Sequence, residues 1–161
     1  ADPIVHEGLG GDVGHGDGIV LSGEGGMAVI DAGETWAGWR RVLPAMRRMR
    51  SSGPALMVVS HEDRDHAGGL LVLLERLPEA VALVWGHGQL RSDLGIHLRV
   101  LAHIRNLEHF PLLEGDRMAV GEWRLKALWP RAATCGERRS RNDCSLQSNA
   151  PGVPHSRFFA S

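Results

Sequence analysis

The sequence has 161 residues, of which 43% are hydrophobic and 23% are charged, and its formal net charge is −1 at pH 7; this is the composition of an ordinary globular domain with a sizeable core. The small net charge excludes an overall basic field, so a nucleic acid would have to be held by local clusters of arginine. No apolar run approaches the roughly 20 residues that span a bilayer, and residues 1–10 lack the basic and apolar regions of a signal peptide.

The first third of the chain predicts a β-hairpin followed by a helix. Two apolar runs, residues 19–21 and 27–30, are separated by Ser-Gly-Glu-Gly-Gly, which is typical of a hairpin turn. In residues 39–50 the apolar side chains recur at helical spacing, with arginines between them. Pro44 lies inside this stretch, and we expect it to mark the first turn of the helix because proline is poorly tolerated in a helix interior.

Strand and helix alternate through the middle of the chain, and strands dominate from residue 110 onward. The pattern predicts buried strands at residues 55–59 and 81–85 and helices at residues 67–77 and 94–107. Further strands are predicted at residues 117–120, 123–129, 145–147 and 157–160. This alternation indicates the α/β or α+β class. We expect one domain over residues 1–161.

Four potential metal ligands fall within six residues, immediately after the first of the two buried strands. They are His61, Asp63, Asp65 and His66. A loop at the carboxyl end of a strand can direct several side chains to one point on a rigid scaffold. Imidazole suits zinc, manganese or iron, and carboxylates favour harder ions. Without a cation these groups would repel one another, so we predict a divalent-metal site; the alternative is a charged, solvated loop.

Residues 61–69, His-x-Asp-x-Asp-His-Ala-Gly-Gly, resemble the signature loop of the metallo-β-lactamase superfamily, with Asp63 where the commoner form has a second histidine. Three further stretches are similar to motifs of one branch, the carboxy-terminal hydrolase domain of ComEC-type bacterial DNA-uptake proteins. They are residues 12–17 (Asp-Val-Gly-His-Gly-Asp), 30–33 (Ile-Asp-Ala-Gly) and 142–146 (Asn-Asp-Cys-Ser-Leu). The resemblance extends from about residue 12 to residue 160. It implies an αββα sandwich.

The resemblance implies a metal-dependent hydrolase, and more specifically a phosphodiesterase or nuclease that acts on single-stranded DNA during bacterial DNA uptake. Mn²⁺ or Zn²⁺ would be the cofactor and would lower the pKa of a bound water. The domain would belong to a membrane protein, on its extracytoplasmic face beside the channel portion. Two alternatives stay open: hydrolysis of another ester, such as a choline phosphoester or a lactone, and a catalytically inactive binding module.

The chain departs from the branch pattern at both ends. Residues 7–11 are glycine-rich where the family has a hydrophobic strand, and His15 replaces a glutamine. The sequence stops at Ser161, where the branch has a further Gly-Asp pair whose aspartate bridges or caps the metal site. We therefore expect a domain truncated at its C-terminus, with the final strand or strands missing and metal affinity weakened.

The resemblance also assigns roles around the metal. His61 and Asp63 would form one ligand set and Asp65 and His66 the other, and Asp65 would orient the attacking water. Asp31 would hold a ligand histidine in one tautomer. Asp17 would add a third catalytic carboxylate, and Asp12 would lie close to it. From the residues alone, these aspartates are equally explained by turns and glycine-rich loops.

Substrate contacts are expected from the loop that precedes the last strands. Asn142, Ser145 and Arg141 would bind the substrate phosphate, with Arg131, Arg138 and Arg139 nearby. A second basic stretch comprises Arg40, Arg41, Arg47, Arg48 and Arg50, for which we expect a solvated helix face. Further candidate ligands by composition alone are His87, His97, His103, His109 and His155. We expect the tryptophans to pack in the core and along the strands rather than to serve as base-stacking platforms; they are Trp36, Trp39, Trp85, Trp123 and Trp129. Cys135 and Cys144 are compatible with a disulfide or with two free thiols.

Overall fold

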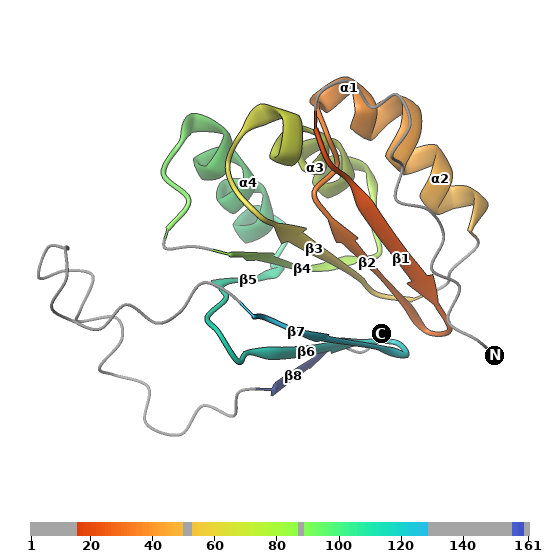
Figure 1. Ribbon diagram of the computed structural model, residues 1–161. Helices are drawn as coiled ribbons and strands as arrows, with labels where there is room; N and C mark the ends of the chain where they lie inside the picture. Colours follow the sequence, from red (N-terminus) through yellow and green to blue (C-terminus); the bar gives the residue numbers. More distant parts are fainter. Residues whose placement is uncertain (1–15, 50–52, 87–88, 129–155, 160–161) are drawn as a thin grey trace, which may run out of the picture.

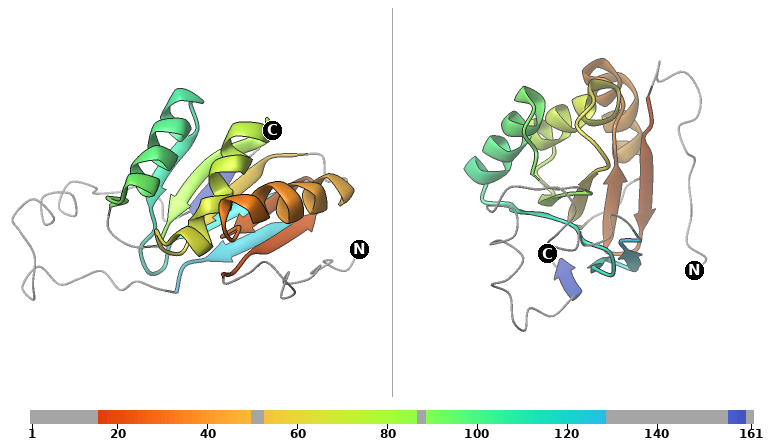
Figure 2. Two further views of the ribbon diagram at one scale, coloured as in Figure 1. Left: turned by 90° about the horizontal axis from the view of Figure 1, so that it is seen from above. Right: turned by 60° about the vertical axis from the view of Figure 1, so that its left-hand side comes forward.

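The computed structural model describes residues 16–49, 53–86, 89–128 and 156–159 (Figure 1). The elements, in chain order, are β1 (Ile19–Gly23), β2 (Gly26–Ile30), α1 (Thr35–Ala37), the π-helix η1 (Gly38–Val42), α2 (Leu43–Arg48), β3 (Ala55–Val59), α3 (Arg64–Arg76), β4 (Ala80–Trp85), α4 (Asp93–Ile104), β5 (Glu108–Pro111), β6 (Arg117–Val120), β7 (Trp123–Lys126) and β8 (Ser156–Phe159). Helices cover one face of a five-stranded sheet, and a three-stranded sheet lies against its other face (Figure 2).

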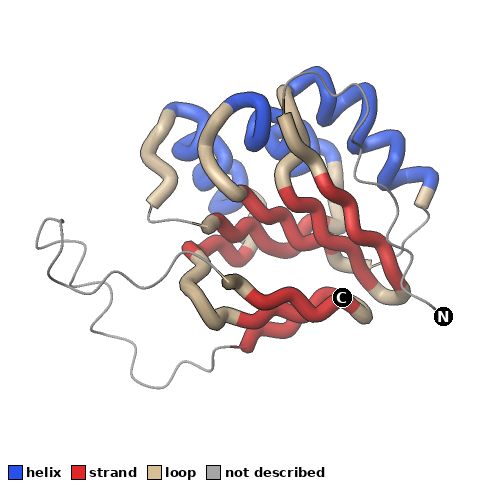
Figure 3. Tube along the Cα trace, in the orientation of Figure 1, coloured by secondary structure: helices blue, strands red, loops and turns tan. Residues whose placement is uncertain are grey.

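The larger sheet has the strand order β1-β2-β3-β4-β5. β1 and β2 form the predicted hairpin, which turns at Glu24 and Gly25, and the glycine has the left-handed φ of 78° that such a turn requires. From β2 to β5 all neighbours are parallel, with helices connecting β2 to β3, β3 to β4 and β4 to β5 (Figure 3). Parallel pairing brings the carboxyl ends of these strands to one edge.

The alternation of side chains along each strand divides the interior into two cores. Val29 and Met57 point into the core beneath the helices, together with Leu70 and Leu73 of α3. Their neighbours along the strands instead fill the space between the two sheets, as Leu56 does. Burial on both faces explains why β3 and β4 are continuous apolar runs rather than alternating ones.

The smaller sheet has the order β7-β6-β8, with β6 antiparallel to β7 and parallel to β8. Together with the helices over the larger sheet it supplies three layers of an αββα sandwich. The mixed α/β architecture is therefore confirmed. Within the described ranges, no helix covers the outer face of the smaller sheet, and none is long and apolar enough to cross a membrane.

All three predicted helices have different boundaries in the structure, and α4 ends at Ile104 rather than at residue 107. α3 begins at Arg64 rather than at residue 67, because Asp65 and His66 themselves form its first turn. The first helical run begins at Thr35 rather than at residue 39, and Pro44 lies in the first turn of α2, as predicted. The π-turn before Pro44 widens the helix, with the Leu43 N–H donating to the Gly38 carbonyl, and this accommodates a ring that would clash with an α-helical backbone.

The tryptophan prediction is correct for Trp85, which is buried, and wrong for two residues of the first helical run. Trp36 and Trp39 are 39% and 44% exposed. They lie on the outer face of the run because Val42, Leu43 and Met46 occupy the face toward the core. Trp129 lies outside the described residues.

Candidate metal centre

The candidate centre forms where two adjacent parallel strands end. Asp31 directly follows β2, Ser60 and His61 directly follow β3, and His66 lies in the first turn of α3. Backbone hydrogen bonds tie these segments together: the Asp31 N–H donates to the Val58 carbonyl at 2.9 Å and the Ala32 N–H to the His66 carbonyl at 2.8 Å. The carboxyl edge of the sheet therefore brings residues from distant parts of the sequence to one place.

Asp31 is the one charged side chain among the described residues that is buried, with 4% of its surface exposed. Its Oδ1 accepts the Ser60 N–H at 2.9 Å, and its Oδ2 accepts the Ser60 hydroxyl at 2.5 Å. Nδ1 of His66 lies 3.1 Å from the same Oδ2. These three partners compensate the cost of burying a carboxylate. The residue has a left-handed φ of 54°, a conformation that aspartate tolerates better than most residues.

This network determines the tautomers of both histidines. An ionised carboxylate only accepts hydrogen bonds, so His66 carries its proton on Nδ1 and leaves a lone pair on Nε2. The Ser60 hydroxyl uses its proton toward Asp31 and therefore accepts from His61 Nδ1, which lies 2.8 Å from Ser60 Oγ. His61 consequently also has a free lone pair on Nε2. One buried carboxylate thus prepares two imidazoles as metal ligands.

The two prepared nitrogens lie beside the two other predicted ligands. Nε2 of His61 is 3.5 Å from Oδ2 of Asp63, and Nε2 of His66 is 3.9 Å from Oδ2 of Asp65. The imidazole centroids are 3.8 Å apart. Donors that share an ion, each about 2.0–2.2 Å from it, lie about 3–4 Å from one another, so the separation within each of these two pairs is compatible with a shared divalent ion. The four do not form one group, since the ligand atoms within 4.8 Å of one another are those of Asp31, His61 and His66. The role of His61, Asp63, Asp65 and His66 as ligands stays a prediction.

Asp31 is itself a possible ligand, since Asp31, His61 and His66 each place one ligand atom within 4.8 Å of the others. Its two oxygens, however, already accept hydrogen bonds from Ser60 and His66. The geometry therefore favours Asp31 as the residue that orients both histidines. From the sequence, Asp31 is predicted to orient one histidine, and the contribution of Ser60 is not predicted. The available signal was a hydroxyl residue between the strand and His61.

Asp17 contacts the loop that follows β2 through its backbone rather than through its side chain. Its carbonyl accepts the Gly33 N–H at 3.0 Å, and its side chain is exposed. The neighbouring Gly16 lies so close to Asp65 that an added Cβ would meet the Asp65 carbonyl oxygen. Asp17 therefore lies at the edge of the centre, and its catalytic role is an untested prediction.

Several other predicted residues lie outside the described ranges. They are Asp12, His87, Asn142, Ser145, His155, the arginines at 131, 138, 139 and 141, and both cysteines. Of the described histidines that were further candidates, His97 and His103 are exposed on α4, as expected for that helix. His109 on β5 packs edge-on against His103, with 6.1 Å between the ring centroids. The ligand group found among the described residues includes none of these three.

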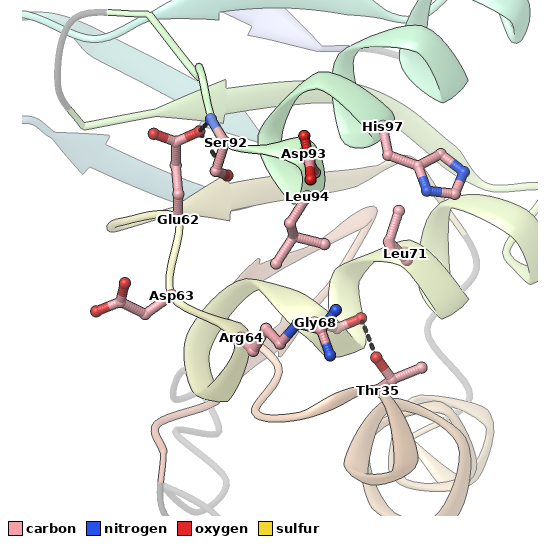
Figure 4. Close-up of a pocket in the computed structure, with 10 residues that line it drawn as sticks. All are labelled: Thr35, Glu62, Asp63, Arg64, Gly68, Leu71, Ser92, Asp93, Leu94 and His97. Carbon is pink, nitrogen blue, oxygen red and sulfur yellow. Dashed lines mark hydrogen bonds between the residues drawn. The ribbon is translucent and has the colours of Figure 1, made fainter.

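A groove of about 500 Å³ lies next to the centre, between α3 and α4 (Figure 4). Asp63 and Arg64 form part of its wall. Glu62, between the two predicted ligands His61 and Asp63, turns toward α4 instead, where its Oε1 accepts the backbone N–H groups of Arg91 and Ser92 at 2.6 and 2.8 Å. Ser92 in turn caps α4. Glu62 thus joins the ligand loop to the far wall of the groove.

The model of the family described as the metallo-beta-lactamase superfamily matches residues 11–136. The matched span covers most of the chain and contains Asp31, Ser60 and the whole run from His61 to Gly69. No curated protein and no solved structure matches the chain.

Proposed function

We propose that this chain, which belongs to the metallo-β-lactamase superfamily, is a phosphodiesterase that cleaves single-stranded DNA. Membership of the superfamily makes it a metal-dependent hydrolase, and the superfamily usually binds divalent metals. The observation that carries the proposal is the network in which Asp31 and Ser60 leave both Nε2 atoms of His61 and His66 free on the side of Asp63 and Asp65.

Under this proposal His61, Asp63, Asp65 and His66 hold the ion or ions. Mixed imidazole and carboxylate donors suit both Mn²⁺ and Zn²⁺, which are the ions we propose. When bound, such an ion lowers the pKa of a coordinated water and stabilises negative charge on the phosphoryl oxygens. This is the chemistry that hydrolysis of an unreactive phosphodiester needs.

The remaining roles belong to side chains of the protein, which orient the metal ligands, accept a proton and bind the substrate. Asp31 and Ser60 keep the two imidazoles fixed, so that little reorganisation is needed during the reaction. Asp65 is partly exposed at the mouth of the centre, where we propose that it orients the attacking water and accepts its proton. Arg64 in the groove is proposed to hold the substrate phosphate, joined by Arg141, Asn142 and Ser145 from the later loop. Asp17 is proposed to assist at the edge of the site.

The cellular setting is part of the same proposal and follows from the resemblance to the ComEC branch. The domain would act during bacterial DNA uptake, on the extracytoplasmic side of the membrane and next to the channel portion of its parent protein. A different ester, such as a choline phosphoester or a lactone, would use the same centre. An inactive binding module would keep the fold without turnover.

Incubation of the purified chain with end-labelled single-stranded DNA and Mn²⁺ or Zn²⁺ tests the proposal. We expect cleavage that a chelator abolishes and that Asp65→Ala lowers by at least about a hundredfold, the size of a lost proton acceptor. Glu75→Ala, which removes an exposed carboxylate from the opposite end of α3, is the matched control and should cleave like the parent chain. Absence of cleavage with either ion, or cleavage that survives Asp65→Ala, contradicts the proposal. Turnover of a choline phosphoester or lactone in its place would reassign the substrate.

A further inference from the structure

Two tryptophans on the surface have no function in the metal centre. Trp36 and Trp39 are 39% and 44% exposed, and no other tryptophan or phenylalanine whose side chain is described is as exposed. Tryptophan is usually among the most buried residues on average, so two exposed rings in one helical run need an explanation. They are three residues apart, and side chains at that spacing lie on the same face of a helix.

Each ring has a fixed partner, and for Trp39 this partner lies over one face of the ring. The Trp36 indole N–H donates to Oε2 of Glu34 at 2.7 Å. The guanidinium carbon of Arg76 on α3 lies 4.7 Å from the centroid of the Trp39 ring, which is a cation–π contact. Rings that are already fixed lose little conformational entropy when a ligand stacks on them. The pair is therefore suited to bind a flat, apolar group.

The same surface is strongly basic, although the whole chain has a net charge of −1. Residues 34–49 contain four arginines, all of them exposed, and a single acidic residue, Glu34, which is engaged with Trp36. The arginines are Arg40, Arg41, Arg47 and Arg48. Flat apolar rings among cations match a ligand that alternates planar bases with phosphates.

This surface begins at the edge of the metal centre. α1 starts four residues after Asp31, and Thr35 lines the groove together with Asp63 and Arg64. The Thr35 hydroxyl also donates to the Gly68 carbonyl of α3 at 3.4 Å. A strand bound along α1, η1 and α2 would therefore enter the groove beside the predicted ligands.

We infer that Trp36, Trp39 and the arginines of this helical run form a binding surface for single-stranded nucleic acid, with bases stacked on the two indoles. A duplex is a poorer fit, because its base faces are hidden by stacking. The inference rests on the proposed function and adds to it the means by which the strand is held and directed to the centre.

An anionic membrane is the competing partner, since tryptophan and arginine also occur together on helices that lie at a bilayer surface. Such helices bury a continuous apolar face in the lipid. Within the described residues of this run, the two tryptophans are the only exposed large apolar side chains, and the exposed Arg40 and Arg41 directly follow Trp39. Charge and ring geometry therefore favour nucleic acid.

Binding is measured with a short fluorescein-labelled oligothymidylate in the presence of a chelator, so that no turnover occurs, using fluorescence anisotropy. We expect Trp36→Ala and Trp39→Ala each to weaken binding by at least about fivefold, the effect of losing one stacked base. The double Trp→Phe variant should keep most of the affinity because phenylalanine still stacks. Ile104→Ala, which truncates an exposed side chain on α4, is the matched control and should bind like the parent chain. Thermal unfolding verifies that each variant is folded.

Three results overturn the inference: no binding by the parent chain, unchanged binding by the double Trp→Ala variant, or a double Trp→Phe variant as weak as the double alanine. Loss of binding to phosphatidylserine–phosphatidylcholine vesicles, with oligothymidylate binding unchanged in the same alanine variants, overturns it in favour of a membrane. Tryptophan-dependent binding without cleavage in Mn²⁺ supports the inference and removes the nuclease proposal. Cleavage in Mn²⁺ together with binding that does not depend on the tryptophans overturns the inference and supports the nuclease proposal.

Discussion

Each histidine of the centre has one ring nitrogen occupied by a hydrogen bond that leads back to Asp31. For His66 the contact is direct, and for His61 it passes through the Ser60 hydroxyl. Burying the Asp31 carboxylate costs free energy, and the same carboxylate orients the imidazole rings of both His61 and His66. It makes metal affinity depend on residues that need not touch the ion.

Asp31→Asn should therefore weaken metal binding while the fold is kept. Asparagine has the same size and also tolerates the left-handed backbone found at this position. Its single amide oxygen cannot accept all three hydrogen bonds that the two carboxylate oxygens accept, because the NH2 group would then face one of the donors. We expect the dissociation constant for Zn²⁺ or Mn²⁺, measured by isothermal titration calorimetry, to rise by about 10–100-fold. An unchanged constant would show that Asp31 does not orient the ligands.

Ser60 offers a finer test of the same network. Ser60→Ala removes the hydroxyl between Asp31 and His61, whereas Ser60→Thr keeps a hydroxyl on the same carbon. We expect metal affinity to fall by about tenfold in the alanine variant. The threonine variant should bind nearly as well as the parent chain. Equal affinity of the two variants in the same titration would argue against the relay.

The sequence predicted the ligand cluster because its four members lie within six residues, where the motif is visible without a fold. The function of Ser60 could not be predicted in this way. It depends on the parallel pairing of β2 with β3, which brings residues 29 positions apart within hydrogen-bond distance. The sequence likewise does not show that Glu62 bonds to the backbone before α4 while Asp63 lies beside His61, because this depends on the direction of each side chain.

At the scale of elements, glycines allow α3 to begin directly beside the loop after β2. The Gly69 N–H donates to the Gly33 carbonyl at 2.8 Å, and a Cβ on Gly69 would lie 2.1 Å from the Ala32 carbonyl oxygen. Backbone contact with Ala32 and Gly33 therefore fixes the position of the first turn of α3, which carries Asp65 and His66. Steric contact with the neighbouring backbone therefore explains why the motif has glycine at positions 68 and 69.

Gly69→Ala should lower the free energy of unfolding by about 1–3 kcal/mol, because α3 has to move away from Ala32. Urea unfolding followed by circular dichroism measures the change. Gly18→Ala is the matched control, since its Cβ would lie 3.4 Å from Ala32 Cα, which is a tolerable contact. An equal loss in both variants would mean that the close approach of Gly69 is not the cause.

Glu62→Ala should loosen the start of α4 without removing the metal. The carboxylate accepts two backbone N–H groups and the Ser92 hydroxyl, and it points toward Ser92 rather than toward Asp63 (Figure 4). We expect faster amide hydrogen exchange at Arg91, Ser92 and Gly95. Zinc affinity should change much less than in Asp63→Ala, and a comparable loss in the two variants would contradict this division of roles.

Element boundaries were predicted best where apolar runs are continuous. Residues 55–59 match β3 in full, and residues 81–85 miss β4 by one position. The start of α3 was missed because its first turn consists of polar ligands, which weaken the apolar periodicity. The π-turn before Pro44 and the edge strand β5 leave no comparable pattern in the sequence.

At the scale of the whole molecule, the metal centre depends on the joined ends of β2, β3 and α3. The order of the larger sheet and the parallel pairing of β6 with β8 are set by contacts between distant segments, and periodicity alone could not predict them. The family resemblance supplied the expected sandwich, and the fold agrees in three of its layers. The α/β class itself was predictable from the alternation of strands and helices.

Because the ligands exist as a set only in the folded chain, a bound ion should stabilise the whole domain. At a metal concentration about a hundred times the dissociation constant, the expected gain is about 2.7 kcal/mol. Thermal unfolding monitored by circular dichroism should show a higher midpoint with Zn²⁺ or Mn²⁺ and a return to the starting value with a chelator. A midpoint that rises equally in His66→Ala would place the ion elsewhere.

X-ray absorption at the zinc edge of the zinc-loaded chain reports the ligands themselves. The structure predicts a shell of nitrogen and oxygen at about 2.0–2.2 Å, with the scattering of two imidazoles that falls to one in His61→Ala. A sulfur shell at about 2.3 Å, or a spectrum unchanged by His61→Ala, would show that the ion is not held by the His61–His66 centre.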